Sequence, residues 1–142
     1  MSDDRTVRTK HGQLTLEQLA ELLPSTGQLM QSVGECWWKC AYAARGGNWP
    51  LAAYFARRVR SLQRDLAVLR PKHRERLETF ESGVLAAVFT AIAAEDRDAF
   101  DRAFATATAL ANEMHVQTGY GYIRWVLPGE APTDLDLGRP ER

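Results

Sequence analysis

The chain of 142 residues has the length of a single domain. Its 18 Lys and Arg residues balance its 18 Asp and Glu residues, so no overall charge attracts nucleic acid or an anionic membrane. The charged N-terminus lacks the apolar core of a secretory signal, and no apolar run is long enough to cross a bilayer. We therefore expect a soluble cytoplasmic protein without membrane association, in which any charge-based interaction is local.

The N-terminal part of the chain contains a clear helix start signal. Residues 1–13 show no hydrophobic periodicity, and we expect a flexible arm there. Thr15 is followed three residues later by Gln18, a spacing that is typical of a capping box. This spacing predicts a short leading helix that ends near Leu23, because Pro24 interrupts the pattern.

The next two helices are predicted by their ends and by their apolar spacing. One is expected to begin at Ser25 or Thr26 and to run through Ala44, where the sequence RGGN ends it. Asn48 as N-cap and Pro50 in the first turn predict the start of the other. Its apolar residues recur at spacings of three and four and form one stripe: Leu51, Phe55, Val59, Leu62, Leu66 and Leu69.

Two further helices follow in the pattern. Pro71 predicts the start of the first of them, because a residue in the first turn needs no backbone amide hydrogen. Its apolar stripe is Leu77, Phe80, Val84, Val88 and Ile92. After the turn sequence AEDRD, the last helix is expected from Arg97 to Gln117, with Gly119 as its stop. Its inward residues are Phe100, Phe104, Ala107, Ala111 and Met114.

Four helices of about 20 residues with short connections favour antiparallel neighbours. We expect an all-α fold, namely an up-down-up-down four-helix bundle over residues 14–128 with a short leading N-terminal helix and an extended C-terminal strap. The segment YIRWVLP is β-prone but has no partner strand, so the strap should bury Tyr122, Trp125 or Leu127. Residues 129–142, which are rich in Pro, Gly and acids, are expected to form an irregular tail with a frayed end.

The two cysteines, Cys36 and Cys40, lie four residues apart and share one face of a predicted helix. Two cysteines are too few for a disulfide framework, and we predict buried, unreactive thiols. A metal site would need further ligands, for which His115, Glu35 and Met30 are the candidates.

Several common catalytic motifs are missing from the sequence. It contains no glycine-rich phosphate loop, no G-x-S-x-G and no H-E-x-x-H. The Glu-x-x-His pairs of di-iron bundles are also missing, because neither His73 nor His115 has a glutamate three residues before it. These enzyme classes are therefore disfavoured.

His115 is the main candidate for contact with a ligand. The covalent haem motif C-x-x-C-H supplies two thiols and an axial histidine, and the same five positions here are Ala111, Asn112, Glu113, Met114 and His115. With this pentapeptide late in the last of four helices, the chain resembles four-helix-bundle proteins of the cytochrome c prime type. It lacks the two haem-attachment cysteines, which excludes covalent attachment here. The resemblance implies non-covalent haem as the cofactor, with His115 as the metal ligand.

Small side chains near His115 leave room for a ligand. Ala111, Thr108, Ala107 and Ala103 precede it at about one to three turns along the helix. The residues expected to contact a planar or apolar ligand are His115, Ala111, Met114, Tyr122, Trp37 and Trp38. In the alternative interpretation, ordinary core packing fills this room with Trp37, Trp38, Phe89 or Tyr122. His115 would then be a solvated or hydrogen-bonded residue near a helix C-terminus.

Two other groups of residues could contact a partner. The tryptophan cluster, which comprises Trp37, Trp38, Tyr42 and Trp49, could line an apolar cavity, contact a protein or simply pack two helices together. The arginine-rich edge comprises Arg57, Arg58, Arg60, Arg64, Arg70, Lys72, Arg74 and Arg76, with only Asp65 and Glu75 among them. It could bind an acidic partner or be a solvated helix face. Aromatic residues are not interleaved with it, which disfavours binding of single-stranded nucleic acid.

These patterns predict a small helical-bundle protein that binds a planar or apolar ligand, with non-covalent haem as the candidate cofactor. The alternative is a cofactor-free protein-interaction module that binds an acidic protein through the arginine-rich edge or the tryptophan cluster. A homodimer is compatible with either function. An enzyme with His115 as general base beside Glu113, Tyr120 or Tyr122 is a third interpretation, but no second catalytic group is fixed by spacing.

Overall fold

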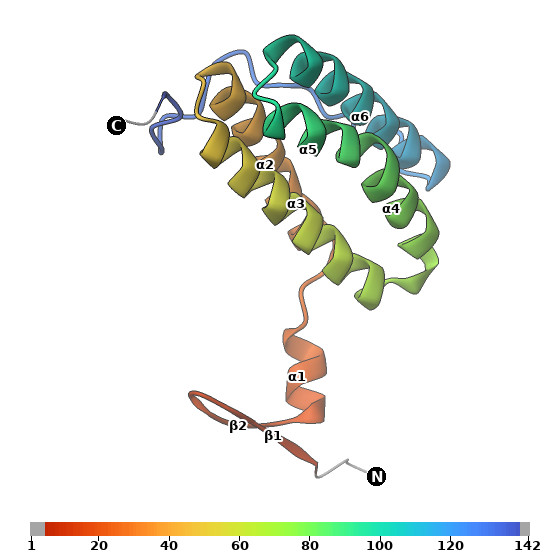
Figure 1. The fold of residues 1–142 in the computed structure, drawn as a ribbon. Helices are drawn as coiled ribbons and strands as arrows, with labels where there is room; N and C mark the ends of the chain where they lie inside the picture. The colour runs from red at the N-terminus through yellow and green to blue at the C-terminus, as the bar shows by residue number, and fades with distance from the viewer. Residues whose placement is uncertain (1–4, 140–142) are drawn as a thin grey trace.

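The computed structural model describes residues 5–139, and most of them are helical (Figure 1). The long helices are α2 (Thr26–Arg45), α3 (Trp49–Leu69) and α6 (Arg97–Gln117). A further helical segment comprises α4 (Arg74–Phe80), the π-helical turn η2 (Glu81–Leu85) and α5 (Ala86–Ala93). These elements pack together as one helical body. None of the helices within residues 5–139 has both the length and the apolar character needed to cross a membrane.

Local capping groups explain where the long helices begin. The Ser25 hydroxyl accepts a hydrogen bond from the Gln28 backbone N–H at 3.1 Å, and the Gln28 side chain accepts one from the Ser25 N–H at 2.9 Å. The Asn48 side chain caps α3 by accepting from the backbone N–H of Leu51 at 3.2 Å. Asp96 caps α6 in the same way. The predicted starts of α2, α3 and α6 are confirmed, because each depends on residues adjacent in sequence.

An N-terminal arm stands away from the helical body (Figure 1). It consists of an antiparallel hairpin, β1 (Thr6–Thr9) and β2 (Gly12–Thr15), followed by α1 (Leu16–Leu22). The predicted capping box of Thr15 and Gln18 is confirmed. Residues 1–13 were expected to form a flexible arm; their described part contains the two short strands, which add a small sheet to a mostly helical fold, and residues 1–4 lie outside the described range. None of residues 5–23 is buried.

The turn and the short strands of this hairpin explain why the sequence pattern does not predict it. Gly12 has a φ of +148°, a conformation that glycine adopts without a steric penalty. The Thr9 hydroxyl donates to the Gly12 carbonyl at 2.9 Å and closes the turn. The paired strands have only four residues each, which is too short for alternation of apolar and polar residues to stand out.

The helical segment after Pro71 differs in register from the sequence prediction. Residues 71–73 form a 3₁₀ turn, and the π-helical turn then inserts an extra residue into the helix. The buried residues Phe80 and Leu85 are consequently five positions apart, and Leu85 is fully buried. The prediction placed Val84 in the stripe, but Val84 is only half-buried. A period of 3.6 residues cannot anticipate this shift.

The core lies between α2, α3, α5 and α6. Trp37 stacks on Phe104, with ring centroids 4.3 Å apart, and meets the edge of Phe80 at 6.4 Å. The indole N–H of Trp37 donates to the Thr108 hydroxyl at 2.9 Å, so its polar atom is satisfied. In the predicted stripe of α3, the four central residues are buried and the two end residues, Leu51 and Leu69, are half-buried.

The segment after α6 runs back along the helical body as a strap without helix or strand (Figure 1). The Asn112 side chain holds it through two hydrogen bonds with the backbone of Trp125, at 2.7 and 3.0 Å. Further along, the Tyr42 hydroxyl donates to the Pro128 carbonyl. Of the three residues among which burial was expected, Trp125 and Leu127 are half-buried, whereas Tyr122 is 81% exposed.

The tail beyond Pro128 also packs on the helical body. Leu137 is buried, and its carbonyl lies so close to Gly46 that any side chain at Gly46 would clash with it. Lys39, which is 5% exposed, pairs with Asp134 at 2.5 Å. Residues 129–139 form no helix or strand, as predicted, but they extend the packed body beyond the expected domain end at residue 128. The expected frayed end lies partly outside the described range, at residues 140–142.

Candidate functional site

A cavity of about 430 Å³ lies between α2, α3, α4, α6 and the strap. We call it the interhelical cavity. Most of its lining side chains are apolar, among them Met30, Val59, Leu66, Phe80 and Ile123. Its volume is within the range of about 300–1,000 Å³ that is typical of small-molecule sites. The cavity can therefore accommodate an apolar molecule of modest size.

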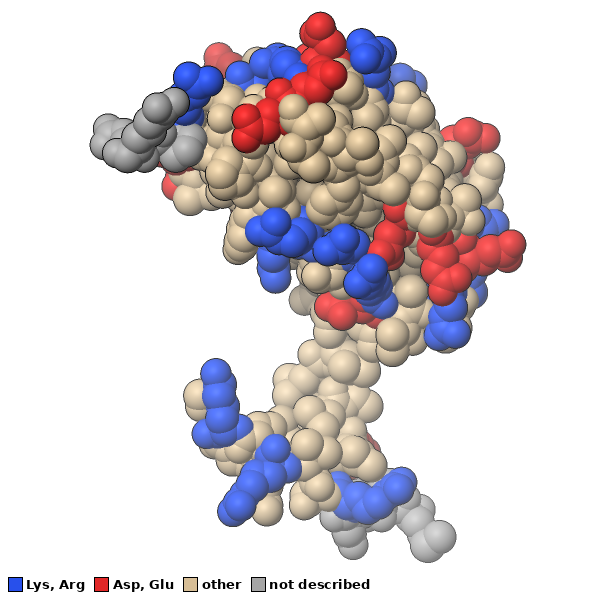
Figure 2. Space-filling view, viewed as in Figure 1, with Lys and Arg blue, Asp and Glu red and all other residues tan. Residues whose placement is uncertain are grey.

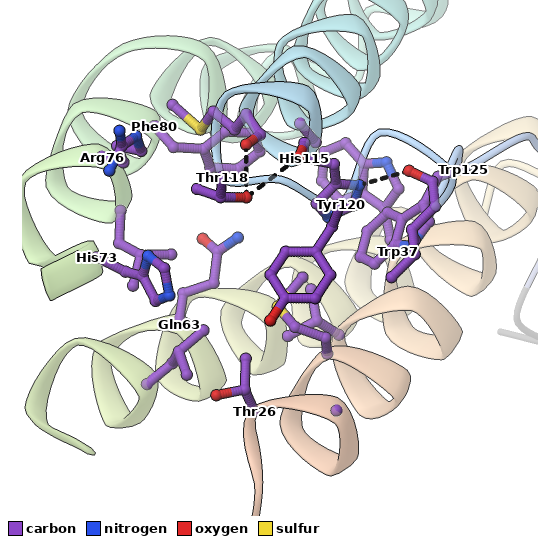
Figure 3. A pocket seen from close by; sticks show the side chains of 18 of the residues that line it. Thr26, Trp37, Gln63, His73, Arg76, Phe80, His115, Thr118, Tyr120 and Trp125 are labelled. Atoms are coloured by element: carbon purple, nitrogen blue, oxygen red, sulfur yellow. Dashed lines mark hydrogen bonds between the residues drawn. The ribbon is translucent and has the colours of Figure 1, made fainter. Parts of the chain in front are cut away.

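The polar side chains of the interhelical cavity are unevenly distributed (Figure 3). Arg76 and His73 lie on one side of the open space, and Trp37 and Trp125 lie on the opposite side. Gln63 projects from α3 between these two sides. The cavity thus has a basic end and an aromatic end.

His115 is a half-buried wall residue of the cavity. Its Nδ1 atom lies 2.9 Å from the carbonyl oxygen of Ile123. Because a carbonyl oxygen only accepts hydrogen bonds, Nδ1 carries the proton in the neutral ring, and Nε2 keeps its lone pair. The ring also meets Trp125 edge to face, with centroids 5.7 Å apart. The strap therefore fixes both the tautomer and the position of His115.

Four of the six predicted contact residues line the interhelical cavity, namely His115, Ala111, Met114 and Trp37. Trp38 does not line it, because it is the next residue after Trp37 on α2 and is therefore turned by about 100°. It lies instead beside Gly34, which the ring of Trp125 also approaches. The exposed Tyr122 does not line it either.

Gln63 is the most informative cavity residue that the sequence did not reveal. It is 7% exposed, and its Oε1 atom accepts no hydrogen bond within the described part of the chain. A buried acceptor without a donor costs on the order of 1–3 kcal/mol, so a donor in the cavity would be stabilising. The signal in the sequence is a polar residue four positions after Val59 in an otherwise apolar stripe.

His73 and Arg76 also line the cavity, although the sequence predicted Arg76 only as part of the arginine-rich edge and did not predict a role for His73. Neither side chain has an ion-pair partner within residues 5–139. Burial lowers the pKa of His73 below its usual value, and the positive charges of Lys72, Arg76 and Arg70 lower it further. The local field at this end of the cavity is therefore positive and favours an anion.

The cysteines lie outside the cavity wall, and both are buried, free thiols as predicted. Burial raises the pKa of Cys40 to about 12 and also raises that of Cys36. Thiolate, the reactive form, is consequently scarce at neutral pH. No group of three or more His, Cys, Asp or Glu residues within 5–139 is placed to hold a metal ion.

Neither the tryptophan cluster nor the arginine-rich edge forms one continuous surface that is free to bind a partner. The aromatic residues of the tryptophan cluster make separate contacts: Trp37 packs in the core, while Trp49 meets Phe100 at 6.1 Å. Basic side chains of the arginine-rich edge gather over α3 in Figure 2. Two of them are engaged, since Arg64 pairs with Glu81 and Arg60 lies over the Phe89 ring at 4.7 Å.

No protein-family model matches the chain, and neither the search of curated proteins nor the search of solved structures finds a significant match.

Proposed function

We propose that this protein binds a small apolar ligand in the interhelical cavity, with His115 among the contacting residues. The observation that carries the proposal is the combination of a mostly apolar cavity of about 430 Å³ with a buried, unsatisfied acceptor on Gln63 in its wall. Small-molecule sites are typically concave and mostly apolar with a few polar groups, and buried polar groups are nearly always satisfied. A bound molecule would account for both features.

We further propose that the fold is an up-down-up-down four-helix bundle with the cavity between its helices. Residues 46–48 connect α2 to α3, and residues 94–96 connect α5 to α6. Connections this short favour antiparallel neighbours. The extensive packing of α2 on α3 and of α5 on α6 supports the same arrangement.

Non-covalent haem is the specific ligand suggested by His115. A histidine that ligates a metal commonly donates its other ring N–H to a carbonyl, which fixes its orientation. The contact between His115 Nδ1 and the Ile123 carbonyl has this form. It leaves Nε2 as the nitrogen that would contact iron. The propionate groups of haem would be attracted to the basic end of the cavity.

The proposal is tested with the neutral fluorescent probe N-phenyl-1-naphthylamine and, separately, with ferric haem. Wild-type protein should bind the probe saturably with one site. Ala111→Phe should weaken binding by at least about tenfold, because the new ring would occupy the cavity. Ala109→Phe is the matched control, since Ala109 is on the same helix but exposed and outside the cavity wall.

Haem binding is followed by absorption. If His115 ligates the iron, His115→Ala should weaken haem binding sharply while leaving the binding of the neutral probe nearly unchanged. Saturable probe binding without haem binding would restrict the proposal to other apolar ligands. If neither molecule binds wild-type protein at micromolar concentration, the interhelical cavity is not a ligand site, and the partner-binding alternative would replace it.

A further inference from the structure

The basic end of the interhelical cavity is built from residues of two elements. His73 belongs to the 3₁₀ turn at Pro71–His73, and Arg76 follows in the first turn of α4. Both side chains line the cavity, and neither has an ion-pair partner among residues 5–139. Arginine presents several N–H donors in a planar fork that matches the two oxygens of a carboxylate. This end is therefore suited to a carboxylate.

Gln63 supplies the second, independent observation. Its side chain is more than nine-tenths buried, its Oε1 atom has no partner in the described chain, and its amide points into the space between the basic and aromatic ends (Figure 3). The buried atom without a partner is the amide oxygen, which needs a hydrogen-bond donor. Rotating the amide by 180° would place its N–H groups there instead, and these can donate to a carboxylate oxygen. Gln63 therefore favours a polar atom of the ligand close to it.

The aromatic end of the cavity favours the apolar or aromatic part of a ligand. Trp125 and Trp37 form this wall, and Met30 and Ile123 are among the other apolar residues that line the cavity. Among the described residues that line the cavity, the basic side chain beside this wall is His115, whose Nδ1 atom already contacts the Ile123 carbonyl. A ligand with one apolar end and one anionic end would thus have a single preferred orientation.

We infer that the natural ligand is an amphipathic carboxylate, whose anionic group lies against Arg76, His73 and the amide of Gln63 and whose apolar body extends from there to Trp37 and Trp125. This inference rests on the proposed function, since it assigns chemistry and orientation to a ligand of the same cavity. The carboxylate could belong to an alkyl-chain acid or to the propionates of haem. Both share the chemistry that the basic end recognises.

The test compares three probes with the same ten-carbon chain: decanoate, 1-decanol and decyltrimethylammonium. Calorimetric titration at pH 7 measures the affinity for each probe. Decanoate should bind most tightly, decanol less tightly and the cation most weakly. Arg76→Gln should weaken decanoate binding by about tenfold, since it removes a charge-assisted contact. The same substitution should leave decanol binding within about twofold of wild type.

Arg74→Gln is the matched control. Arg74 is an exposed neighbour that does not line the cavity, and its loss removes the same charge from the same helix. Decanoate binding should change by less than about twofold in this variant. His115→Ala distinguishes the two carboxylate sources, because it should weaken haem binding far more than decanoate binding: haem loses its iron ligand, whereas decanoate loses only one contact with the cavity wall.

Each outcome bears on a different claim. If decanol binds as tightly as decanoate and Arg76→Gln is silent, the carboxylate inference is overturned while the apolar site stands. Equal weakening by Arg76→Gln and Arg74→Gln would also overturn it, because the effect would then be general charge attraction. Failure of all three probes to bind, together with failure of the neutral naphthylamine, would instead contradict the proposed function itself.

Discussion

Leu85 and Val84 are neighbouring residues with different degrees of burial because of the π-helical turn. Leu85 is fully buried, whereas Val84 is half-buried at the side of the core. A regular helix continuing from Leu77 and Phe80 would have placed Val84 inward instead. The difference in burial between the two side chains therefore indicates the helical register of this segment.

We predict that Leu85→Ala destabilises the protein by about 2–5 kcal/mol, as is typical when a buried leucine is truncated. Val84→Ala should cost about half of that or less, because a half-buried side chain loses less contact. Urea unfolding of both variants provides the measurement. A larger cost at Val84 than at Leu85 would contradict the π-helical register.

The sequence predicted some residues of the candidate site and did not predict others. His115 was identified because a lone histidine followed small residues at helical spacing. Gln63 was not, since a polar residue in an apolar stripe is indistinguishable from a surface position until the neighbouring helices are placed. Arg76 was predicted only as part of the arginine-rich edge and His73 was given no role, because their convergence on a cavity depends on the turn at Pro71–His73.

At the scale of elements, helix ends were predictable and non-local packing was not. The start of α3 followed from the cap at Asn48, whereas those of α2 and α6 followed from Pro24 and from the turn sequence AEDRD; all three signals involve only adjacent residues. The packed tail depends on contacts between residues far apart in sequence, such as Lys39 with Asp134. The compositional pattern of Pro, Gly and acids gives no information about such contacts.

The contact between the tail and α2 should depend on pH. Its hydrogen bond to Lys39 lowers the pKa of Asp134 below the ordinary 3.8, and Asp134, followed by Glu35, raises the pKa of Lys39 above 10.5. The stabilisation from Asp134 is present above pH 3.8 and is lost as the pH falls through the lowered value. The stabilisation from Lys39 is present below pH 10.5 and is lost as the pH rises through the raised value.

Asp134→Asn should therefore lower the melting temperature at pH 7, and the difference from wild type should shrink as the pH falls below 3.8. Thermal melts of both proteins across this range provide the measurement. Asp65→Asn is the control, because Asp65 is exposed and has no ion pair within the described residues. A difference that persists unchanged in acid would show that this charge pair does not hold the tail.

At the scale of the whole molecule, the chain separates into a packed helical body and an arm. None of residues 5–23 is buried, and Leu22 and Leu23 are exposed by 70% and 55%. A two-stranded hairpin and a seven-residue helix are marginal without tertiary contacts. The ligand proposal involves only the helical body, since the cavity wall begins at Thr26, after the arm.

The most direct test of the central claim uses the four tryptophans as internal reporters. Trp37 and Trp125 line the interhelical cavity, whereas Trp38 and Trp49 do not. In a nitrogen-15 labelled sample titrated with N-phenyl-1-naphthylamine, ring currents from the bound probe should shift the indole N–H signals of Trp37 and Trp125. The side-chain amide of Gln63 should move with them, and Trp49 should stay in place. Saturable binding that shifts Trp49 but leaves Trp37, Trp125 and Gln63 unchanged would contradict the account.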